Sequence, residues 1–440
     1  MYLEKTLISF DLNESCKTKL YRPETYKDLF KICSESDQVI ALGGGLSYSL
    51  AGTAPKATIN MKMFDRILSF KETSEGATIS VEAGITLESL LKFSIAKGYF
   101  LSILPGYPLI TVGGCVAFNV HGKCQYNIGN FESVVESITL FHPLYGTKTL
   151  SRSENSELFE LTVGGIGLTG IILSVELKLK KLKGNKLKLN KAFVKNPLDA
   201  VEKMESLKGK FDYIYSWNDF NLNGAKFGQG YVYSEEFING PITTQSPLNL
   251  ELKEINRKFP KVLNQLSIPI MTKVYAQMEK LKSTNELDLI NGLFPILGKE
   301  IYYKMFGKNG FYEYQFIVSP ENFSNVLKQI YELKSRLNIK IALASLKLFS
   351  GKQTNLNFNG TGICLALDVA AGVNQKRFFE EIDQLMIRYN GTVNLSKDSR
   401  LTKETVEKLF KNYGEFKRKI LQYDPNLKFQ STLSKRIGIT

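Results

Sequence analysis

The sequence predicts an α+β fold divided into two domains, and three observations support this. The chain of 440 residues is too long for one ordinary hydrophobic core. Its first part is rich in short strands and lacks the regular βαβ rhythm of a nucleotide-binding sheet. Its second part alternates longer helices with longer strands, which is typical of an antiparallel sheet covered by helices.

In the first part, a helix is expected from Tyr26 to about Cys33, followed by a buried strand, QVIALGGG, that ends in a glycine turn. ATINM, RILSF and ATISVEAG are short strands, and TLESLLKFSIAKGYF is a helix that starts at Thr86. The lysine-rich stretch 178–191, KLKKLKGNKLKLNK, predicts a strand pair with a solvated lysine face. A phosphate-binding or membrane-facing edge is the alternative for this stretch.

The second part contains two strand–helix–strand units. The first is FYEYQFIVS, a helix from Ser319-Pro320-Glu321 to about Arg336, and IKIALASLKLF. The second is GICLALDVA, a helix near Gln375 to Arg388, and GTVNLS. Residues 251–299 are weakly patterned, so a mobile lid and a packed helix pair remain alternatives there.

Composition narrows the function classes. The formal net charge of +14 favours encounter with anions such as phosphorylated substrates, lipid head groups or nucleic acid. Neither RNA-binding motifs nor a helix-turn-helix pattern supports nucleic acid. The spacing of the five cysteines predicts neither a disulfide framework nor a zinc or other metal site, and favours a reducing compartment. With neither a signal peptide nor a transmembrane segment visible, we expect a cytoplasmic protein.

Two glycine-rich segments, LGGGLSYS at 42–49 and TVGGCVAFNVHGKCQYNIGNF at 111–131, indicate a binding site. Glycines let backbone N–H groups come close to a bulky anion. Each segment alone is equally compatible with a glycine turn between strands. Two such loops, both after apolar strands and far apart in the chain, predict a grip on one extended ligand from both sides.

The order LGGGLSYS, LPG, TVGGCVAFNVHGK and LTVGGIGLTGII resembles the flavin-contacting segments of the vanillyl-alcohol-oxidase superfamily, with its para-cresol-methylhydroxylase (PCMH) type of FAD domain. Within it, VGG…HGK…GNF, GFYEYQF, LKLF and NLSKDSR are similar to the decaprenylphosphoryl-β-D-ribose 2′-oxidase family. The resemblance implies an FAD-binding domain at 1–183 and a substrate-binding domain at 184–391. It also implies a C-terminal segment, 392–440, that returns to the FAD domain.

The same resemblance implies the cofactor site. Its residues are Ala41, Gly43, Gly44, Gly45, Leu46, Ser47, Tyr48, Gly106, Thr111, Val112, Gly113, Gly114, Phe118, Asn119, Val120, His121, Ile171 and Asn394. Several superfamily members attach FAD through a histidine in the first loop, where this chain has Leu46. We therefore expect noncovalent FAD.

On the substrate side, Lys397 matches the family's active-site lysine, and a cation there suits the negative charge that develops when hydride reaches flavin N5. The proton of the substrate hydroxyl could pass to a neutral Lys397, to His121 or to Tyr48. Expected substrate-binding residues are Lys123, Glu313, Gln315, Lys304, Cys364 and Lys347. His142 is expected to be only a turn residue.

Several positions depart from the family. Glu313 replaces an amide and Lys304 an arginine. Cys364 occupies the place of an asparagine, and Ala366 that of an inhibitor-reactive cysteine. These changes surround the sugar, so they bear on substrate identity.

We therefore expect oxidation of a secondary alcohol on a sugar, with a polyprenyl-phosphoryl pentose as substrate, in the oxidase half of an epimerisation. A short-chain dehydrogenase would be the partner, and the charge suggests peripheral contact with the inner face of a membrane. The alternatives are an aldonolactone or alditol oxidase acting on a soluble polyol, and a non-enzymatic protein that binds another anion.

Overall fold

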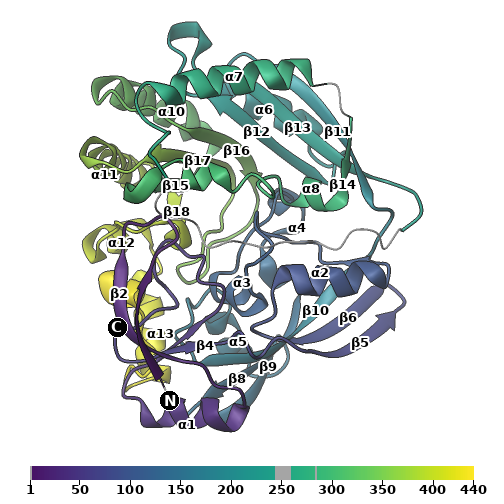
Figure 1. The fold of residues 1–440 in the computed structure, drawn as a ribbon, viewed down its shortest axis with the longest axis vertical. Coiled ribbons are helices and arrows are strands. Elements are labelled where there is room, and N and C mark those ends of the chain that lie inside the picture. The colour runs from purple at the N-terminus through teal and green to yellow at the C-terminus, as the bar shows by residue number, and fades with distance from the viewer. Residues whose placement is uncertain (1, 243–258, 283–284) are drawn as a thin grey trace.

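The computed structural model describes residues 2–242, 259–282 and 285–440 of the chain. The elements up to β10 form the lower lobe in Figure 1, and those from β11 to α11 form the upper lobe. This arrangement of antiparallel sheets with helices is the predicted α+β fold.

A small mixed sheet opens the first lobe. Its order is β1-β2-β4-β3, with β1 antiparallel to β2 and the other neighbours parallel. Its strands are β1 (Tyr2–Ile8), β2 (Ser15–Tyr21), β3 (Ile40–Leu42) and β4 (Thr58–Asn60). The predicted buried strand is β3, so the glycine turn Gly43–Gly45 starts at its carboxyl end.

The second sheet of this lobe is antiparallel, with the order β5-β6-β10-β8-β9 and with β7 added along β10. Its strands are β5 (Ile67–Thr73), β6 (Gly76–Glu82), β7 (Tyr99–Phe100), β8 (Val135–His142), β9 (Gly146–Ser151) and β10 (Ile171–Lys181). The accompanying helices are α1 (Tyr26–Glu35), α2 (Leu87–Ala96) and α5 (Ser156–Thr162), with a 3₁₀ turn at Phe131–Val134. Thr86 caps α2 as predicted, because its hydroxyl accepts from Ser89 N at 3.2 Å.

The glycine-rich stretch 111–131 is helical at its start, which corrects the expectation of a loop. It contains α3 (Val112–Phe118) and α4 (Gln125–Ile128). Thr111 caps α3 by accepting from Gly114 N at 3.3 Å. Glycines disfavour helix locally, but burial of one face of α3 in the core of the lobe supplies the stability.

The lysine-rich strands belong to different sheets, which corrects the predicted strand pair. β10 pairs with β6, β7 and β8, whereas β11 (Lys186–Val194) pairs with β13 and β14 in the second lobe. Both strands nevertheless carry exposed lysines that alternate with buried leucines. Lys178 pairs with Glu136 and Lys188 with Glu236, so the solvated lysine face is confirmed on each strand separately.

The second lobe is built on two antiparallel sheets, with the orders β12-β13-β11-β14 and β16-β17-β15-β18. The further strands are β12 (Tyr213–Asp219), β13 (Gln229–Ile238), β14 (Glu286–Asp288), β15 (Phe311–Val318), β16 (Leu343–Phe349), β17 (Gly362–Ala370) and β18 (Thr392–Val393). Leu346 N on β16 donates to Ser216 Oγ on β12 at 3.2 Å. The two sheets therefore meet edge to edge.

Helices cover these sheets (Figure 1). They are α6 (Pro197–Leu207), α7 (Ser267–Leu281), α8 (Leu289–Leu293), α9 (Ile301–Lys304), α10 (Pro320–Arg336) and α11 (Val373–Arg388), with 3₁₀ turns at Gly224–Lys226 and Gly307–Asn309. The segment 251–299, for which a lid and a helix pair were alternatives, contains α7, β14 and α8. Its residues 251–258 and 283–284 lie outside the described part of the chain.

The C-terminal segment packs against the first lobe. It contains a 3₁₀ turn (Leu395–Lys397), α12 (Lys403–Leu409), α13 (Tyr413–Tyr423) and α14 (Thr432–Arg436). Tyr48 N donates to Ser396 O at 3.0 Å, Thr432 N donates to Thr53 O at 2.7 Å, and Val39 forms a β-bridge with Phe429. The domain limits 183/184 and 391/392 stay a prediction. Among the described helices, none combines the length and the apolar character needed to cross a membrane.

Candidate active site

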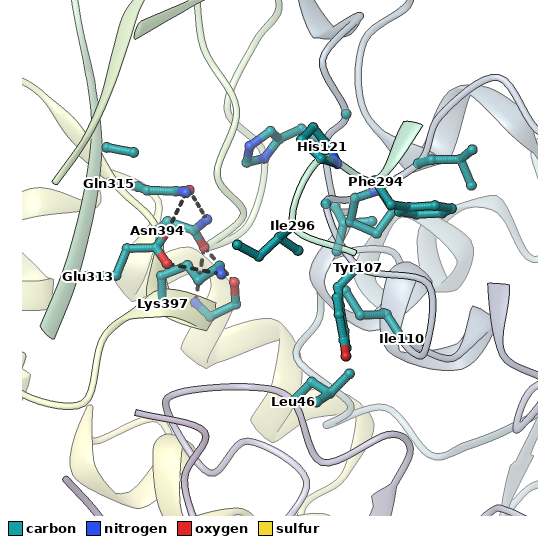
Figure 2. A pocket seen from close by; sticks show the side chains of 18 of the residues that line it. Leu46, Tyr107, Ile110, His121, Phe294, Ile296, Glu313, Gln315, Asn394 and Lys397 are labelled. Carbon is teal, nitrogen blue, oxygen red and sulfur yellow. Dashed lines mark hydrogen bonds and ion pairs between the residues drawn. The ribbon is translucent and has the colours of Figure 1, made fainter. Parts of the chain in front are cut away.

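One cavity of about 1250 Å³ is lined by residues of both lobes and of the C-terminal segment. Figure 2 shows Leu46, Tyr107 and Ile110 of the first lobe on one side and Lys397 with its polar neighbours on the other. Ile296 lies between the two sides, and the His121 ring lies above the polar cluster. The cavity therefore joins segments that are far apart in sequence.

The two glycine-rich segments press against each other at this cavity. A Cβ on Gly43 would lie 2.3 Å from Thr111 Oγ1, and one on Gly44 would lie 2.6 Å from Leu109 O. Gly45 has a φ of +67°, a conformation that favours glycine. The two segments therefore lie side by side at one cavity, as a shared grip on one ligand requires.

Most of the residues predicted for the cofactor site line the cavity. They are Ala41, Gly43, Gly44, Gly45, Leu46, Ser47, Gly106, Thr111, Gly113, Gly114, Phe118, Asn119, Val120, His121 and Asn394. Val112 and Ile171 do not line it, which corrects the prediction. Val112 faces the core on the inner side of α3, and alternation along β10 turns Ile172, rather than Ile171, toward the cavity.

A hydrogen-bonded group, here called the lysine cluster, lies on the substrate side. It consists of Lys397, Glu313, Tyr48, Gln315 and Asn394. Lys397 Nζ lies 3.2 Å from Glu313 Oε2 and 3.1 Å from Tyr48 Oη, and Tyr48 Oη donates to Glu313 Oε2 at 2.9 Å. Gln315 Nε2 donates to Glu313 Oε1 at 2.6 Å, and Asn394 Nδ2 donates to Gln315 Oε1 at 2.8 Å. Glu313 and Gln315 share one face of β15, as predicted.

The hydroxyl of Tyr48 is a proton donor in this cluster. Tyr48 is buried beside the cavity rather than lining it. Burial and the adjacent Glu313 carboxylate raise the pKa of Tyr48 well above 10. Tyr48 therefore stays protonated, which argues against its predicted role as proton acceptor.

Asp368, which the sequence did not single out, is a second carboxyl group in the cavity wall. Burial and then the Glu313 carboxylate raise the pKa of Asp368 well above 3.8. Tyr302 Oη donates to Asp368 Oδ2 at 2.8 Å, while Oδ1 is buried without a partner among the described residues. The raised pKa favours the protonated form of Asp368.

His121 and Lys347 form the other polar edge. The His121 ring packs against Phe349 and Phe358, with ring centroids 4.9 and 5.4 Å apart. Burial, followed by the charges of Lys347 and Lys397, holds the pKa of His121 well below 6.5. His121 is therefore neutral near pH 7 and has a lone pair to accept a proton.

Lys123 lines the cavity, but its ammonium group forms an ion pair within the protein. Its ammonium lies 2.9 Å from Glu235 Oε2 and donates to the carbonyl of Gly292. It also lies 4.5 Å from the centre of the Tyr215 ring. The pair with Glu235 and the bond to Gly292 join β13 to α8, and the predicted contact of Lys123 with an anionic substrate stays a prediction.

Two other predicted substrate residues lie away from the cavity surface. Lys304 on α9 does not line the cavity, whereas its neighbours Tyr302 and Tyr303 do. Cys364 is buried in a cluster with Phe358, which lines the cavity in its place. Burial raises the pKa of the Cys364 thiol to about 12.

An apolar arm of the cavity extends under α7 and was not predicted. It is formed on the sheet side by Leu189, Tyr215, Trp217 and Tyr233, and on the helix side by Ile268, Met271 and Tyr275. Alternation of aromatic residues along β12 and β13 was the only sequence signal for it. Helix α7, which covers this arm, lies in the weakly patterned segment 251–299, so the sequence did not predict that it packs on β12 and β13.

His142 also proved more than a turn residue. Its side chain is buried and accepts from Leu144 N at 3.1 Å, and its Nε2 lies 3.7 Å from Asp424 Oδ1 of the C-terminal segment. It lies outside the cavity lining.

Comparison with known proteins agrees with this geometry. Residues 20–144 match a family described as an FAD binding domain. The chain carries a PCMH-type FAD-binding domain. It is an FAD-dependent oxidoreductase that acts on CH–OH groups, which rejects the alternative of a non-enzymatic binding protein.

Relatives of this oxidoreductase include sugar and lactone oxidases. The decaprenylphosphoryl-β-D-ribose oxidase of Mycolicibacterium smegmatis is 27% identical over 91% of this chain and 89% of that protein. The mitochondrial L-galactono-1,4-lactone dehydrogenase of Arabidopsis thaliana is 27% identical, over 36% of this chain and 26% of that protein. The D-arabinono-1,4-lactone oxidase of Saccharomyces cerevisiae is 27% identical over 32% and 27%. The chain thus spans only about a quarter of the length of these two relatives.

The residues present fit FAD. The glycine turn after β3 and the start of α3 offer backbone without side chains at the cavity wall, where added Cβ atoms at Gly43 and Gly44 would collide with the facing segment. Gly106 adds a third open stretch, since a Cβ there would meet nothing within 4 Å.

Proposed function

We propose that this oxidoreductase converts a secondary alcohol of a sugar to a ketone, and that the sugar is a pentose carried on a polyprenyl phosphate. The observation that carries the proposal is that one cavity combines the FAD-side glycine segments, the lysine cluster and the apolar arm. The first two suit alcohol oxidation, and the third suits a prenyl chain. The similarity to decaprenylphosphoryl-β-D-ribose oxidase supports the substrate class.

Bound FAD supplies the hydride acceptor. Lys397 contributes a positive charge held on the cavity wall, which stabilises negative charge that develops during the oxidation. Glu313 and Tyr48 fix the ammonium in place through bonds of 3.2 and 3.1 Å.

We assign acceptance of the hydroxyl proton to His121. Both oxygens of Glu313 already accept hydrogen bonds, from Tyr48, Lys397 and Gln315. Tyr48 keeps its own proton. His121 is the candidate that is neutral and lines the cavity.

Lys347 is our candidate for the partner of the phosphate. It lines the cavity on β16 and makes no ion pair within the described residues, unlike Lys123 and Lys397. A short-chain dehydrogenase that reduces the ketone to the opposite configuration would complete an epimerisation.

The test is reduction of the flavin by substrate without oxygen. Purified holoenzyme is mixed anaerobically with a short-chain polyprenyl-phosphoryl pentose, and loss of flavin absorbance is followed together with the appearance of a product two hydrogens lighter. Bleaching by this compound, but not by the free pentose, supports the proposal. Bleaching only by aldonolactones or alditols would instead support the second candidate, an oxidase for soluble polyols, which the matches to lactone oxidases over the first lobe favour.

A further inference from the structure

Helix α7 presents apolar side chains on two faces, and only one of them packs against other described residues of the protein. Ile268, Met271 and Tyr275 turn inward and line the apolar arm of the cavity. On the outer face, Ile270 and Val274 are 64% and 52% exposed. Packing in the core therefore does not explain why the outer face of α7 is apolar.

The exposed residues form a continuous stripe. Leu266, Ile270, Val274 and Met278 follow one another at intervals of four and, with Leu281, lie on one side of a helix with 3.6 residues per turn. Leu281 is 81% and Met278 is 63% exposed. A contiguous apolar surface of this kind marks an interaction site in a folded protein. We call these five residues the α7 stripe.

The inner face of α7 is firmly held, so the stripe is not the result of a loosely placed helix. Glu279 accepts from Tyr233 Oη at 3.0 Å, and its backbone carbonyl accepts from Lys191 Nζ. The Trp217 and Tyr275 rings pack edge to face, with centroids 4.7 Å apart. The helix is therefore fixed with the stripe turned outward.

Basic residues border the stripe. Lys273 and Lys280 lie on α7 and Lys282 follows it directly, and all three are exposed. A helix with an apolar stripe and a lysine border is the pattern that lies in the interface of an anionic membrane. The net charge of +14 adds long-range attraction to the same surface.

The stripe is continuous with the substrate cavity. Met278 belongs to the stripe and also lines the cavity, and the partly exposed Tyr275 lines the cavity one turn earlier. A lipid chain that leaves the head-group layer beside α7 would therefore meet the apolar arm at Met278. A second copy of this protein would cover the stripe but would block this route.

We propose that α7 docks the enzyme on the surface of an anionic lipid bilayer, with the α7 stripe in the head-group and acyl boundary and with Met278 at the entrance for the lipid chain. The proposal rests on the proposed function for its purpose, since a membrane-resident substrate is what makes docking useful. The docking itself can be measured without any substrate.

A fluorescent label on Val274 tests the docking directly. The five native cysteines are all buried, so Val274→Cys in the holoenzyme can be labelled selectively with an environment-sensitive fluorophore. We expect a blue shift with vesicles of equal phosphatidylglycerol and phosphatidylcholine, reversed by high salt, and no shift with phosphatidylcholine alone. Leu144→Cys is the matched control, because Leu144 is an exposed leucine between β8 and β9, in the lobe that does not carry α7.

Charge and apolar variants give the second measurement. Lys273→Gln with Lys280→Gln should lower partition to anionic vesicles about thirtyfold, from about 1 kcal/mol per lysine near the surface. Ile270→Glu with Val274→Glu should abolish sedimentation with vesicles. All four changes should leave flavin reduction by a short, water-soluble substrate unchanged, because none of these residues lines the cavity.

A Val274 label that stays unshifted with anionic vesicles would overturn the proposal. So would a shift that appears without vesicles and grows with protein concentration, since that would assign the α7 stripe to a second copy of the chain. Normal flavin bleaching in either case would leave the proposed function standing. Vesicle docking without bleaching by any polyprenyl-phosphoryl sugar would refute the function and not the docking.

Discussion

Replacing Lys397 by alanine is expected to leave FAD bound and to slow reduction of the flavin by substrate about 10²- to 10³-fold. This is the usual effect of removing one fixed electrostatic group from a water-poor site. Lys397 lies 3.2 Å from Glu313 and 4.2 Å above the centre of the Tyr48 ring, so its ammonium is held in place before substrate arrives. It lies on the polar side of the cavity, across from Leu46 of the first glycine segment, so cofactor binding should persist (Figure 2).

The same change also has a cost in stability that must be separated from the effect on rate. Without Lys397, the Glu313 carboxylate, whose side chain is only 9% exposed, loses its cation. The Lys397 side chain is 32% exposed, so solvent screens the pair. We therefore expect a loss of about 1–3 kcal/mol in the free energy of unfolding, below the 3–5 kcal/mol of a fully buried pair.

The double variant Lys397→Ala, Glu313→Gln separates the two effects. It removes the unpaired carboxylate, so the melting temperature should return close to that of the wild type while flavin reduction stays slow. Stopped-flow absorbance under anaerobic conditions gives the rate, and thermal unfolding gives the stability. A double variant that regains the wild-type rate would refute the reasoning, because Lys397 would then serve only to hold Glu313.

Three other predictions follow from the site. Gly43→Ala places a Cβ 2.3 Å from Thr111 Oγ1 and should reduce the FAD content of the purified protein at least tenfold. Gly414→Ala is the control, because open space surrounds Gly414, and equal FAD content in the two variants would contradict the site. Asp368→Asn should raise the melting temperature at pH 8 more than at pH 5. The folded state keeps a proton on Asp368 that the unfolded chain loses above its ordinary pKa of 3.8, so the stability of the wild type falls as the pH rises toward the folded-state pKa. Equal increases at both pH values would show that Asp368 is ionised in the folded state. Acid precipitation should release all flavin into the supernatant, since Leu46 offers no side chain for attachment, and flavin retained in the pellet would contradict this.

Local patterns in the sequence predicted most elements because strands and helices carry their own periodicity. The strand β3 with its glycine turn, the cap of α2 at Thr86 and the start of α10 at Pro320 depend on residues that are close together in sequence. The helix α3 was missed because glycines hide its pattern, and its stability comes from packing contacts with distant segments.

Local patterns in the sequence did not predict which distant strands and side chains pair with each other. The strands β10 and β11 look alike in sequence, yet they join different sheets, since register depends on partners elsewhere in the chain. The pairing of Lys123 with Glu235, more than a hundred residues away, is hidden for the same reason.

The candidate site shows the same difference between features that local motifs predict and features that depend on long-range contacts. Glu313, Gln315 and Lys397 could be named from motifs, and the structure brings them into one cluster. Asp368 belongs to no recognisable motif, and its raised pKa results from burial beside Glu313, which the local sequence does not reveal. The side on which Ile171 and Cys364 face was decided by neighbours that no short motif contains.

The C-terminal segment supplies Lys397 and Asn394 and is tied to the first lobe through Ser396, Phe429 and Thr432. During synthesis, the glycine segments leave the ribosome hundreds of residues before the lysine that faces them. The enclosure for the flavin can therefore be completed only after translation has passed residue 432, and a product released early would carry the nucleotide-binding turns without the wall that makes them an enzyme.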